Sequence, residues 1–293
     1  MVWLFRLLSL LPLRFLHAVG AFLGAMVYWT SSRERERVSD NLRLAYPGGV
    51  PSGLAWKSAL SAGRSMVELP WLWGRPIEET VLRVDSVSGW ERIEEAQSRG
   101  EALLFFTPHI GCFEMVGQYI GTKLPITCLY RAPKNPALLP IYDEGRNRGQ
   151  MRGAAADAAG VRALVRALRQ KQAVGILPDQ VPQHGEGEWV PFFGRPAYTM
   201  TLAARFSQMK GVSVFFVYAT RESGAKYAFF SQPARFSEAS ADDEILRATE
   251  INQQIEAIIH QRPDQYFWSY NRYKSPHAGA HLKLDAAQKA GDS

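Results

Sequence analysis

A short apolar run that ends in two helix-breaking residues is the segment that most constrains this chain. The run Leu103–Thr107 has the length of a buried strand, and the proline and Gly111 that follow interrupt any regular element. A helix can begin directly after this break. His109 therefore lies at the carboxyl end of a strand, and Glu114 lies in the first turn of the following helix. The segment predicts a strand–turn–helix unit, which is the building block of an α/β fold.

The spacing of His109 and Glu114 suggests a catalytic pair. Residues five apart on one helix point about 140° away from each other, since each residue turns the helix by about 100°. The break between them allows Glu114 to accept the Nδ1–H of His109, which leaves the other ring nitrogen free as a base. The alternative is a surface histidine beside a glutamate that simply favours a helix N-terminus. The pair alone leaves both interpretations open.

The composition allows one large hydrophobic core or two modest ones, because the chain has 293 residues of which 46% are hydrophobic. Its two cysteines, Cys112 and Cys128, are too few for a disulfide scaffold and are typical of a reducing compartment. No CxxC, HExxH or second His/Cys cluster accompanies His109 and Cys112, so we expect no metal site. The net charge of +6 favours an anionic partner: nucleic acid, anionic lipid or a phosphorylated substrate.

The N-terminal segment Val2–Thr30 is apolar enough to predict a membrane anchor. It is interrupted by Arg6, Arg14 and His17. A bilayer span needs about 20 apolar residues, and the cleanest run, Phe15–Trp29, is shorter unless Arg14 is buried or reaches the interface. The alternatives are a tilted span, an in-plane amphipathic anchor and a cleaved signal peptide. Because no small-x-small cleavage site is present and the charged Arg33–Arg37 follows directly, we expect an uncleaved anchor over residues 1–30.

Between residues 31 and 274, short apolar runs alternate with amphipathic segments. The predicted strands are Thr80–Val87, Leu103–Thr107, Ile126–Tyr130, Ala173–Leu177, Val212–Tyr218 and Tyr227–Ser231. The predicted helices are Arg33–Tyr46, Pro51–Trp73, Trp90–Arg99, Phe113–Ile120, Gly160–Lys171, Tyr198–Lys210 and Asp242–Gln261. This alternation predicts an α/β domain with a mixed, partly parallel sheet flanked by helices. The tail 275–293 lacks periodicity, and we expect it to be disordered.

Polar residues follow three of the predicted strands. His109 follows the first of them, Arg131 the next, and Asp179 with Gln180 the third. Sites in open α/β sheets gather at the carboxyl ends of the strands, so these residues are expected to face one pocket. Each also has a structural interpretation: Arg131 as a surface ion pair, Asn135 as a helix cap and Asp179–Gln180 as a turn.

An ordered set of motifs makes the chain similar to a known family. The set comprises the N-terminal apolar segment, His-x4-Glu at His109 and Glu114, Tyr130-Arg131-x3-Asn135, Pro178-Asp179-Gln180, Val190–Gly194 followed by Thr199, and Tyr266–Lys274. It resembles the late (secondary) acyltransferases of lipid A biosynthesis in Gram-negative bacteria, within the lysophospholipid acyltransferase superfamily. The acid is Glu114 and not the aspartate typical of glycerol-phosphate acyltransferases, and ILPDQVP stands where those enzymes carry FPEG-T-R-S. Both departures favour the lipid A branch.

The resemblance implies transfer of a fatty acyl chain from acyl carrier protein, without a cofactor, to a hydroxyl of a lipid A precursor. It implies an enzyme at the cytoplasmic face of the bacterial inner membrane. His109 is expected to be the general base, oriented by Glu114. The residues expected to bind substrate are Arg131, Asn135, Asp179, Gln180, Thr199 and Arg272.

Two further groups of residues have expected roles. Arg131 or backbone amides near Gly111 are candidate donors to the oxyanion. The aromatic residues that can line an acyl groove, or simply form the core, are Phe105, Phe106, Phe113, Phe192 and Phe193.

Three functions remain open from the sequence. The first is the lipid A acyltransferase, and the second is the same chemistry on another glycolipid, an aminolipid or a lysophospholipid. The third is a non-catalytic membrane-binding protein on the same scaffold. The aromatic and basic segment Tyr266–Lys274 suits a lipid headgroup layer. It also suits stacking on single-stranded nucleic acid, but the apolar N-terminus argues against a nucleic-acid partner.

Overall fold

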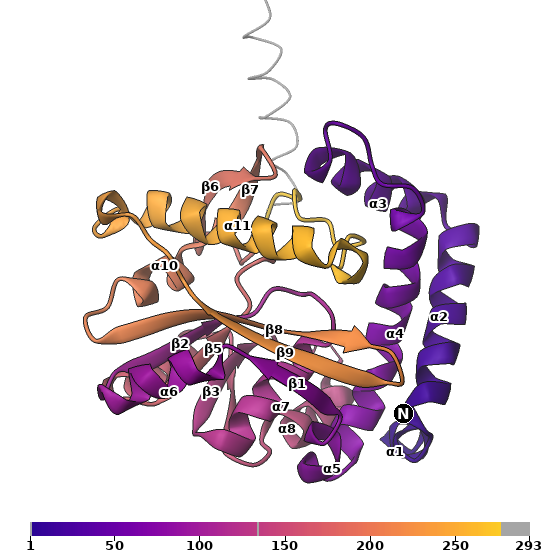
Figure 1. The fold of residues 1–293 in the computed structure, drawn as a ribbon, viewed down its shortest axis with the longest axis horizontal. Coiled ribbons are helices and arrows are strands. Elements are labelled where there is room, and N and C mark those ends of the chain that lie inside the picture. The colour runs from indigo at the N-terminus through magenta and orange to yellow at the C-terminus, as the bar shows by residue number, and fades with distance from the viewer. Residues whose placement is uncertain (1, 134, 277–293) are drawn as a thin grey trace, which may run out of the picture.

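The computed structural model describes residues 2–133 and 135–276. The fold is built around a seven-stranded sheet with the strand order β1-β9-β8-β2-β5-β3-β4 (Figure 1). The strands are β1 (Val84–Ser88), β2 (Ala102–Phe106), β3 (Ile126–Tyr130), β4 (Met151–Ala155), β5 (Ala173–Ile176), β8 (Val212–Glu222) and β9 (Lys226–Pro233). Strands β8, β2, β5, β3 and β4 run parallel, whereas β9 is antiparallel to β8 and β1 is parallel to β9. The predicted mixed, partly parallel sheet is confirmed.

The centre of the sheet is covered on both faces, which explains its continuous apolar strands. Every residue of β2 and of β5 is buried. Strand β5 lies between β2 and β3, so the carboxyl ends of these three strands meet at one edge. The residues that follow these strands therefore lie at the same edge of the sheet.

Helices cover the two faces as separate layers (Figure 1). The core on one face includes side chains from α3 (Ser32–Ala45), α9 (Ala158–Arg169), α10 (Thr201–Ser207) and α11 (Glu244–Gln261). The core on the other includes side chains from α6 (Trp90–Ser98), α7 (Phe113–Lys123), α8 (Leu139–Arg146) and the end of α4 (Leu54–Gly74). Local sequence fixes where helices begin: Asp157 caps α9 by accepting from Gly160, and Asp243 caps α11.

The N-terminal apolar segment forms two helices, α1 (Val2–Ser9) and α2 (Leu13–Thr30), on either side of Pro12. Leu13 and Leu16 belong to the core. Helix α2 crosses α4 closely, because a Cβ atom at Gly63 would lie 2.0 Å from the carbonyl oxygen of Gly20. Among the helices of residues 2–133 and 135–276, none combines the length and apolarity that crossing a bilayer needs.

Two predicted elements differ from the structure. The strand expected at Thr80–Val87 is a short helix, α5 (Ile77–Val81), followed by β1, because Pro76 and two acidic residues favour a helix start. The helix expected to begin at Tyr198 begins at Thr201.

Several elements were not predicted from the sequence. Residues before Thr201 form the hairpin of β6 (Gly187–Phe192) and β7 (Arg195–Met200). Helix α8, β4 and three short 3-10 helices, η1 (Pro136–Leu138), η2 (Glu238–Ser240) and η3 (Pro263–Gln265), were also not expected. The expected disordered tail lies outside the described residues from residue 277 onward.

Candidate active site

His109 is held by Asp179 at the carboxyl edge of the sheet. The ring Nδ1 of His109 lies 2.7 Å from Oδ1 of Asp179. The backbone amide of His109 donates to the other carboxylate oxygen of Asp179 over 2.8 Å. Asp179 is buried, with 1% of its side chain exposed, whereas His109 keeps 16% exposed and lines a cavity. The two contacts fix the ring and turn Nε2 away from the carboxylate.

Asp179 has an environment that keeps it ionised. Burial alone would raise its pKa, but the neighbouring His109 and the two hydrogen bonds from it outweigh burial and lower the pKa below its usual value. The buried guanidinium of Arg272 acts in the same direction. An ionised carboxylate at Nδ1 selects one tautomer of His109 and stabilises the imidazolium that forms when the ring accepts a proton.

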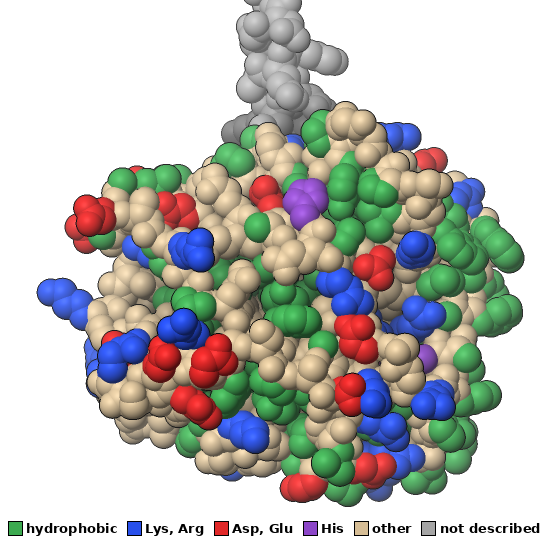
Figure 2. Space-filling view, in the orientation of Figure 1, with side chains coloured by type: hydrophobic (Ala, Val, Ile, Leu, Met, Phe, Trp, Pro, Cys, Tyr) green, Lys and Arg blue, Asp and Glu red, His purple; other side chains and the backbone are tan. Residues whose placement is uncertain are grey.

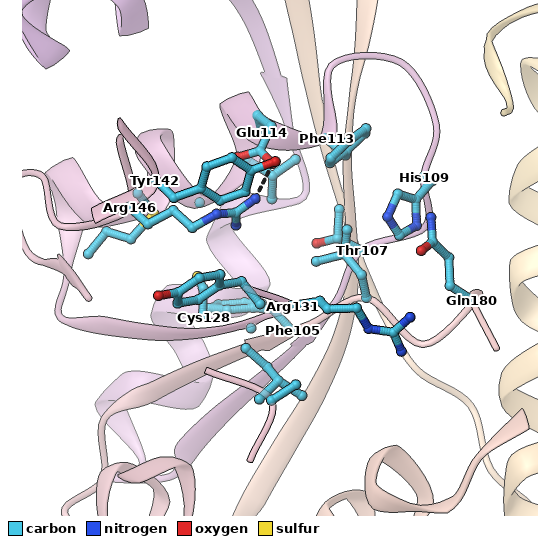
Figure 3. A pocket seen from close by; sticks show the side chains of 18 of the residues that line it. Phe105, Thr107, His109, Phe113, Glu114, Cys128, Arg131, Tyr142, Arg146 and Gln180 are labelled. Atoms are coloured by element: carbon cyan, nitrogen blue, oxygen red, sulfur yellow. Dashed lines mark hydrogen bonds and ion pairs between the residues drawn. The ribbon is translucent and has the colours of Figure 1, made fainter. Parts of the chain in front are cut away.

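Glu114 does not orient His109, contrary to the sequence expectation. Its Oε1 accepts a hydrogen bond from Nη2 of Arg146 over 2.5 Å. Figure 3 shows Phe113 between the two sites, with Glu114 and Arg146 on one side and His109 on the other. The first turn of α7 therefore points Glu114 to the opposite side of the cavity, and the ring of Phe113 packs against His109 with centroids 4.7 Å apart.

Arg146 is the functional candidate that the sequence reasoning missed. Its guanidinium lies over three aromatic rings, at 5.3 Å from Trp73, 5.2 Å from Tyr130 and 5.7 Å from Tyr142. These rings and Glu114 leave it only 16% exposed. Arg146 belongs to α8, which was not predicted, and nothing in the pattern distinguished it from the other arginines of residues 146–152.

An apolar cavity of about 390 Å³ extends from His109 beneath α7 and α8. This volume is within the usual range of ligand sites, ~300–1,000 Å³. The apolar side chains that line the cavity include Phe105, Phe113, Val116, Ile120, Ile126, Cys128, Met151 and Leu177. Gly117 and Gly175 leave room in the cavity wall because they lack a side chain. A Cβ at Gly117 would lie 2.8 Å from the sulfur of Met151, and one at Gly175 would lie 3.1 Å from the sulfur of Cys128. A long hydrocarbon chain is the kind of ligand that suits this lining.

The aromatic residues proposed for an acyl groove divide into two groups. Phe105 and Phe113 line the cavity. Phe106 and Phe192 are buried in the core on the other face of the sheet, and Phe193 packs against that core. Only the first group can therefore contact a ligand in the cavity.

The predicted substrate-binding residues also divide. Arg131 and Gln180 line the cavity, and Nη2 of Arg131 donates to the carbonyl of Val181 over 3.3 Å. Asn135 lies outside the cavity lining and caps η1, as its structural interpretation predicted.

Thr199 and Arg272 are buried away from the cavity. Nη2 of Arg272 donates to Oγ1 of Thr199 over 2.6 Å, and Nη1 donates to the carbonyl of Tyr198 over 2.8 Å. Arg272 thus supports β7 and lies near Asp179, without reaching a ligand in the cavity.

The backbone amides around Gly111 are engaged within the fold. The amide of Gly111 donates to the backbone carbonyl of Gln265 over 3.0 Å, and the amide of Cys112 donates to the backbone carbonyl of Ala219 over 2.8 Å. Gly111 has a φ of +55°, and a Cβ there would lie 2.1 Å from the carbonyl oxygen of Ala219. These two amides are thus not free to bind an oxyanion, whereas Arg131 faces the cavity (Figure 3). Within the described ranges, no group of three or more metal-ligating side chains lies together.

A histidine held by a carboxylate beside an apolar cavity is an arrangement that can activate a hydroxyl next to a bound hydrocarbon chain. Comparison with known proteins agrees. The family model described as bacterial lipid A biosynthesis acyltransferase matches residues 1–275. The chain belongs to this family and is an acyltransferase, as the sequence resemblance predicted.

Three relatives from Escherichia coli (strain K12) illustrate the similarity. The lipid A biosynthesis palmitoleoyltransferase is 26% identical over 274 residues, which cover 92% of this chain and 88% of that protein. The lipid A biosynthesis lauroyltransferase is 25% identical, over 90% of this chain and 87% of its own length. The lipid A biosynthesis myristoyltransferase is 23% identical, over 93% and 85%.

Proposed function

We propose that this chain transfers a fatty acyl group from the thioester of acyl carrier protein to a hydroxyl of a lipid A precursor at the cytoplasmic face of the inner membrane. The observation that carries the proposal is the contact of His109 with Asp179 at the mouth of the apolar cavity. The names of the relatives support the lipid A acceptor. The resemblance in sequence supports the carrier-protein donor.

The reaction follows from the orientation of the ring. Nε2 of His109 accepts the proton of the acceptor hydroxyl while the hydroxyl oxygen attacks the thioester carbonyl carbon. The carbon–sulfur bond breaks, the thiolate takes the proton back from the imidazolium, and the products are an ester and a thiol. Asp179 remains ionised and stabilises the imidazolium. A base positioned in this way typically contributes about 10²–10⁴ in rate.

Arg131 supplies positive charge at the cavity mouth. Its guanidinium faces the cavity and has one hydrogen bond to a carbonyl, which leaves other donors for an anionic group. We assign it to the oxyanion of the tetrahedral intermediate. If it instead binds a phosphate of donor or acceptor, Arg131→Ala will raise KM and leave kcat unchanged.

The Glu114–Arg146 pair shapes the cavity on the side away from His109. Arg146 bridges Glu114 and the aromatic rings of Trp73, Tyr130 and Tyr142. These residues come from α4, β3 and α8, so the pair joins elements that enclose the acyl chain.

Membrane binding is proposed through the exposed side of α1 and α2. The large exposed apolar side chains that the structure describes on α1, on α2 and in the turn between them are Trp3, Leu7, Leu10, Phe15, Phe22, Leu23, Met26, Val27 and Trp29. The opposite side of α2 packs on α4, so these helices are suited to lie in the membrane surface.

The experiment that tests the proposed function is acyl transfer from acyl carrier protein to a tetra-acylated lipid A precursor in detergent micelles. His109→Ala is expected to lose activity by a factor on the order of 10³. His260→Ala is the matched control, because His260 is exposed on α11 and does not line the cavity. Full activity in folded His109→Ala would contradict the mechanism. Absence of transfer by the folded wild type would contradict the acceptor.

A further inference from the structure

A second, open cavity of about 910 Å³ lies where α2, α4, η3 and the turn between β8 and β9 meet. Its charged lining residues are Arg14, Lys57, Arg64, Arg221, Glu222, Arg262 and Asp264. Figure 2 shows Lys and Arg side chains gathered on the right of the face, beside the hydrophobic side chains at the right edge. None of these residues lines the cavity at His109.

The acidic residues of this second cavity are already paired. Arg262 lies 2.6 Å from Glu222 and 3.9 Å from Asp264. Arg221 is neutralised by the buried carboxylate of Glu68 at 2.5 Å.

Three cations of the cavity remain without an ion pair. Among the residues that the structure describes, Arg14, Lys57 and Arg64 form no ion pair with any carboxylate. The second cavity therefore carries an excess of positive charge.

The environment of Arg64 disfavours its positive charge. Burial and the neighbouring Arg221 lower the pKa of Arg64, even though Glu68 and Asp264 oppose the change. A half-buried guanidinium beside another cation is stabilised when an anion enters. A phosphate or carboxylate group is the ligand that supplies this charge.

Arg14 connects the cavity to the apolar surface of α2. Its Nε donates to the carbonyl of Gly224 over 3.2 Å, which places the guanidinium at the β8–β9 turn. Phe15 follows directly and is 53% exposed. Arg14, one of the two arginines that interrupt the apolar N-terminal run, thus lies at the border between the exposed apolar side of α2 and the charged cavity.

We propose that this cavity binds the anionic headgroup, phosphate or carboxylate, of a lipid in the membrane surface that α1 and α2 contact. The proposal rests on the proposed function in placing α2 at a membrane and, for one source of the headgroup, in the identity of the acceptor. The headgroup comes either from the acceptor or from an anionic phospholipid. Arg221 forms part of the lining and donates to the carbonyl of Gly111, two residues after His109, so the occupied cavity lies behind the loop that carries the base.

The test uses the double variant Lys57→Gln/Arg64→Gln in the full chain. Arg162→Gln/Arg166→Gln is the control, since both of these arginines are exposed on α9 and the same charge is removed. Binding is measured by flotation with vesicles of phosphatidylcholine alone or mixed with phosphatidylglycerol. The acceptor KM is measured separately in neutral detergent micelles. If the double variant does not fold, Lys57→Gln alone is used, because Lys57 is exposed.

An anionic phospholipid in the cavity predicts that the double variant loses roughly tenfold or more in binding to the phosphatidylglycerol vesicles, and that the control loses less. The acceptor in the cavity predicts a roughly tenfold higher KM with unchanged kcat. The proposal would be overturned if the double variant lost no more vesicle binding than the control and its acceptor KM rose no more than that of the control. His109→Ala is expected to bind vesicles like wild type, so failure of acyl transfer and failure of headgroup binding are separate results.

Discussion

His109 is held through both its ring and its backbone amide by the single carboxylate of Asp179. Two contacts from one buried side chain restrict the ring more than a surface ion pair does, because neither group is free to rotate into solvent. His109 and Asp179, the proposed base and its proposed orienting acid, follow two adjacent parallel strands, β2 and β5. The geometry of the pair is therefore set by the sheet.

The first residue-scale prediction concerns the tautomer of His109. In ¹⁵N NMR of histidine-labelled protein, the proton of neutral His109 is expected on Nδ1 in wild type and in Glu114→Gln. Asp179→Asn is expected to change this signal, because an amide can also donate to Nδ1. A changed signal in Glu114→Gln with an unchanged one in Asp179→Asn would return the orienting role to Glu114.

The second residue-scale prediction concerns the Glu114–Arg146 pair. Glu114→Ala leaves the charge of Arg146 largely buried and unpaired, so we expect a loss of roughly 2 kcal/mol in the free energy of unfolding. The double variant Glu114→Ala/Arg146→Ala is expected to be less destabilised than the sum of the two single variants. Urea unfolding of the four proteins measures this coupling, and additive losses would show that the pair does not interact.

At the residue scale, the sequence placed His109, Arg131 and Gln180 near one another, but it did not predict which carboxylate holds His109. His109, Arg131 and Asp179 follow strands that were recognisable as buried apolar runs. The choice between Glu114 and Asp179 depends on the path of the turn at Gly111, whose left-handed conformation is set by contact with the distant β8. Arg146 was not predictable because its partners come from three separate elements.

At the element scale, the crossing of α2 and α4 depends on glycine. A methyl group at Gly63 would lie 2.0 Å from the carbonyl oxygen of Gly20, so the two helices must separate to accept it. Gly63→Ala is expected to cost about 1–3 kcal/mol in the free energy of unfolding. Gly48→Ala is the control, since nothing lies within 4 Å of a Cβ there. Equal thermal stability of the two variants would contradict the close packing of α2.

The β6–β7 hairpin and strand β4 were not predicted because their apolar patterns are short or broken. The β6–β7 hairpin turns at Phe193 and Gly194, both with positive φ, and a phenylalanine gives no turn signal. Strand β4 has the sequence MRGAA, which lacks the β-branched and aromatic residues typical of strands. In both cases tertiary contacts, not local sequence, decide the structure.

At the scale of the whole molecule, a buried ionic cluster joins the N-terminal helices to the sheet. Glu68 of α4 contacts His17 of α2 at 2.9 Å, Arg221 of β8 at 2.5 Å and Tyr227 of β9 at 3.2 Å. Burial would raise the pKa of Glu68, but Arg221 and His17 outweigh it and lower the pKa to about 2. The cluster therefore links folding to the ionisation of one carboxylate.

This cluster predicts how stability depends on pH. An unfolded glutamate has a pKa of about 4.3, so the folded state favours ionised Glu68. Its contribution is complete above that value and is lost as the pH falls toward about 2. A shift of this size corresponds to about 3 kcal/mol.

Unfolding free energies across this pH range test the prediction. Glu68→Gln is expected to be less stable at neutral pH and to show a flatter acid limb than wild type. An acid limb as steep as that of wild type would show that Glu68 is not the linked group.

The proposed membrane binding also belongs to the scale of the whole molecule. Replacing Phe22 and Trp29 with serine removes two of the exposed apolar side chains of α2, and each such side chain contributes up to about 1.5–3 kcal/mol on burial. We expect at least tenfold weaker flotation with phosphatidylcholine vesicles. Ile245→Ser on α11 is the control, since Ile245 is 53% exposed outside the N-terminal helices. Unchanged flotation of the α2 variant would contradict the proposed membrane surface.

The turnover of Asp179→Asn in acyl transfer to the lipid A precursor tests the central claim most directly. The substituted amide would keep the shape of the side chain but lack the charge that stabilises the imidazolium of His109. We predict that kcat falls by a factor on the order of 10³ while the donor KM and the thermal unfolding temperature stay close to wild type. Wild-type kcat in this variant would show that His109 does not act through Asp179 and would contradict the mechanism.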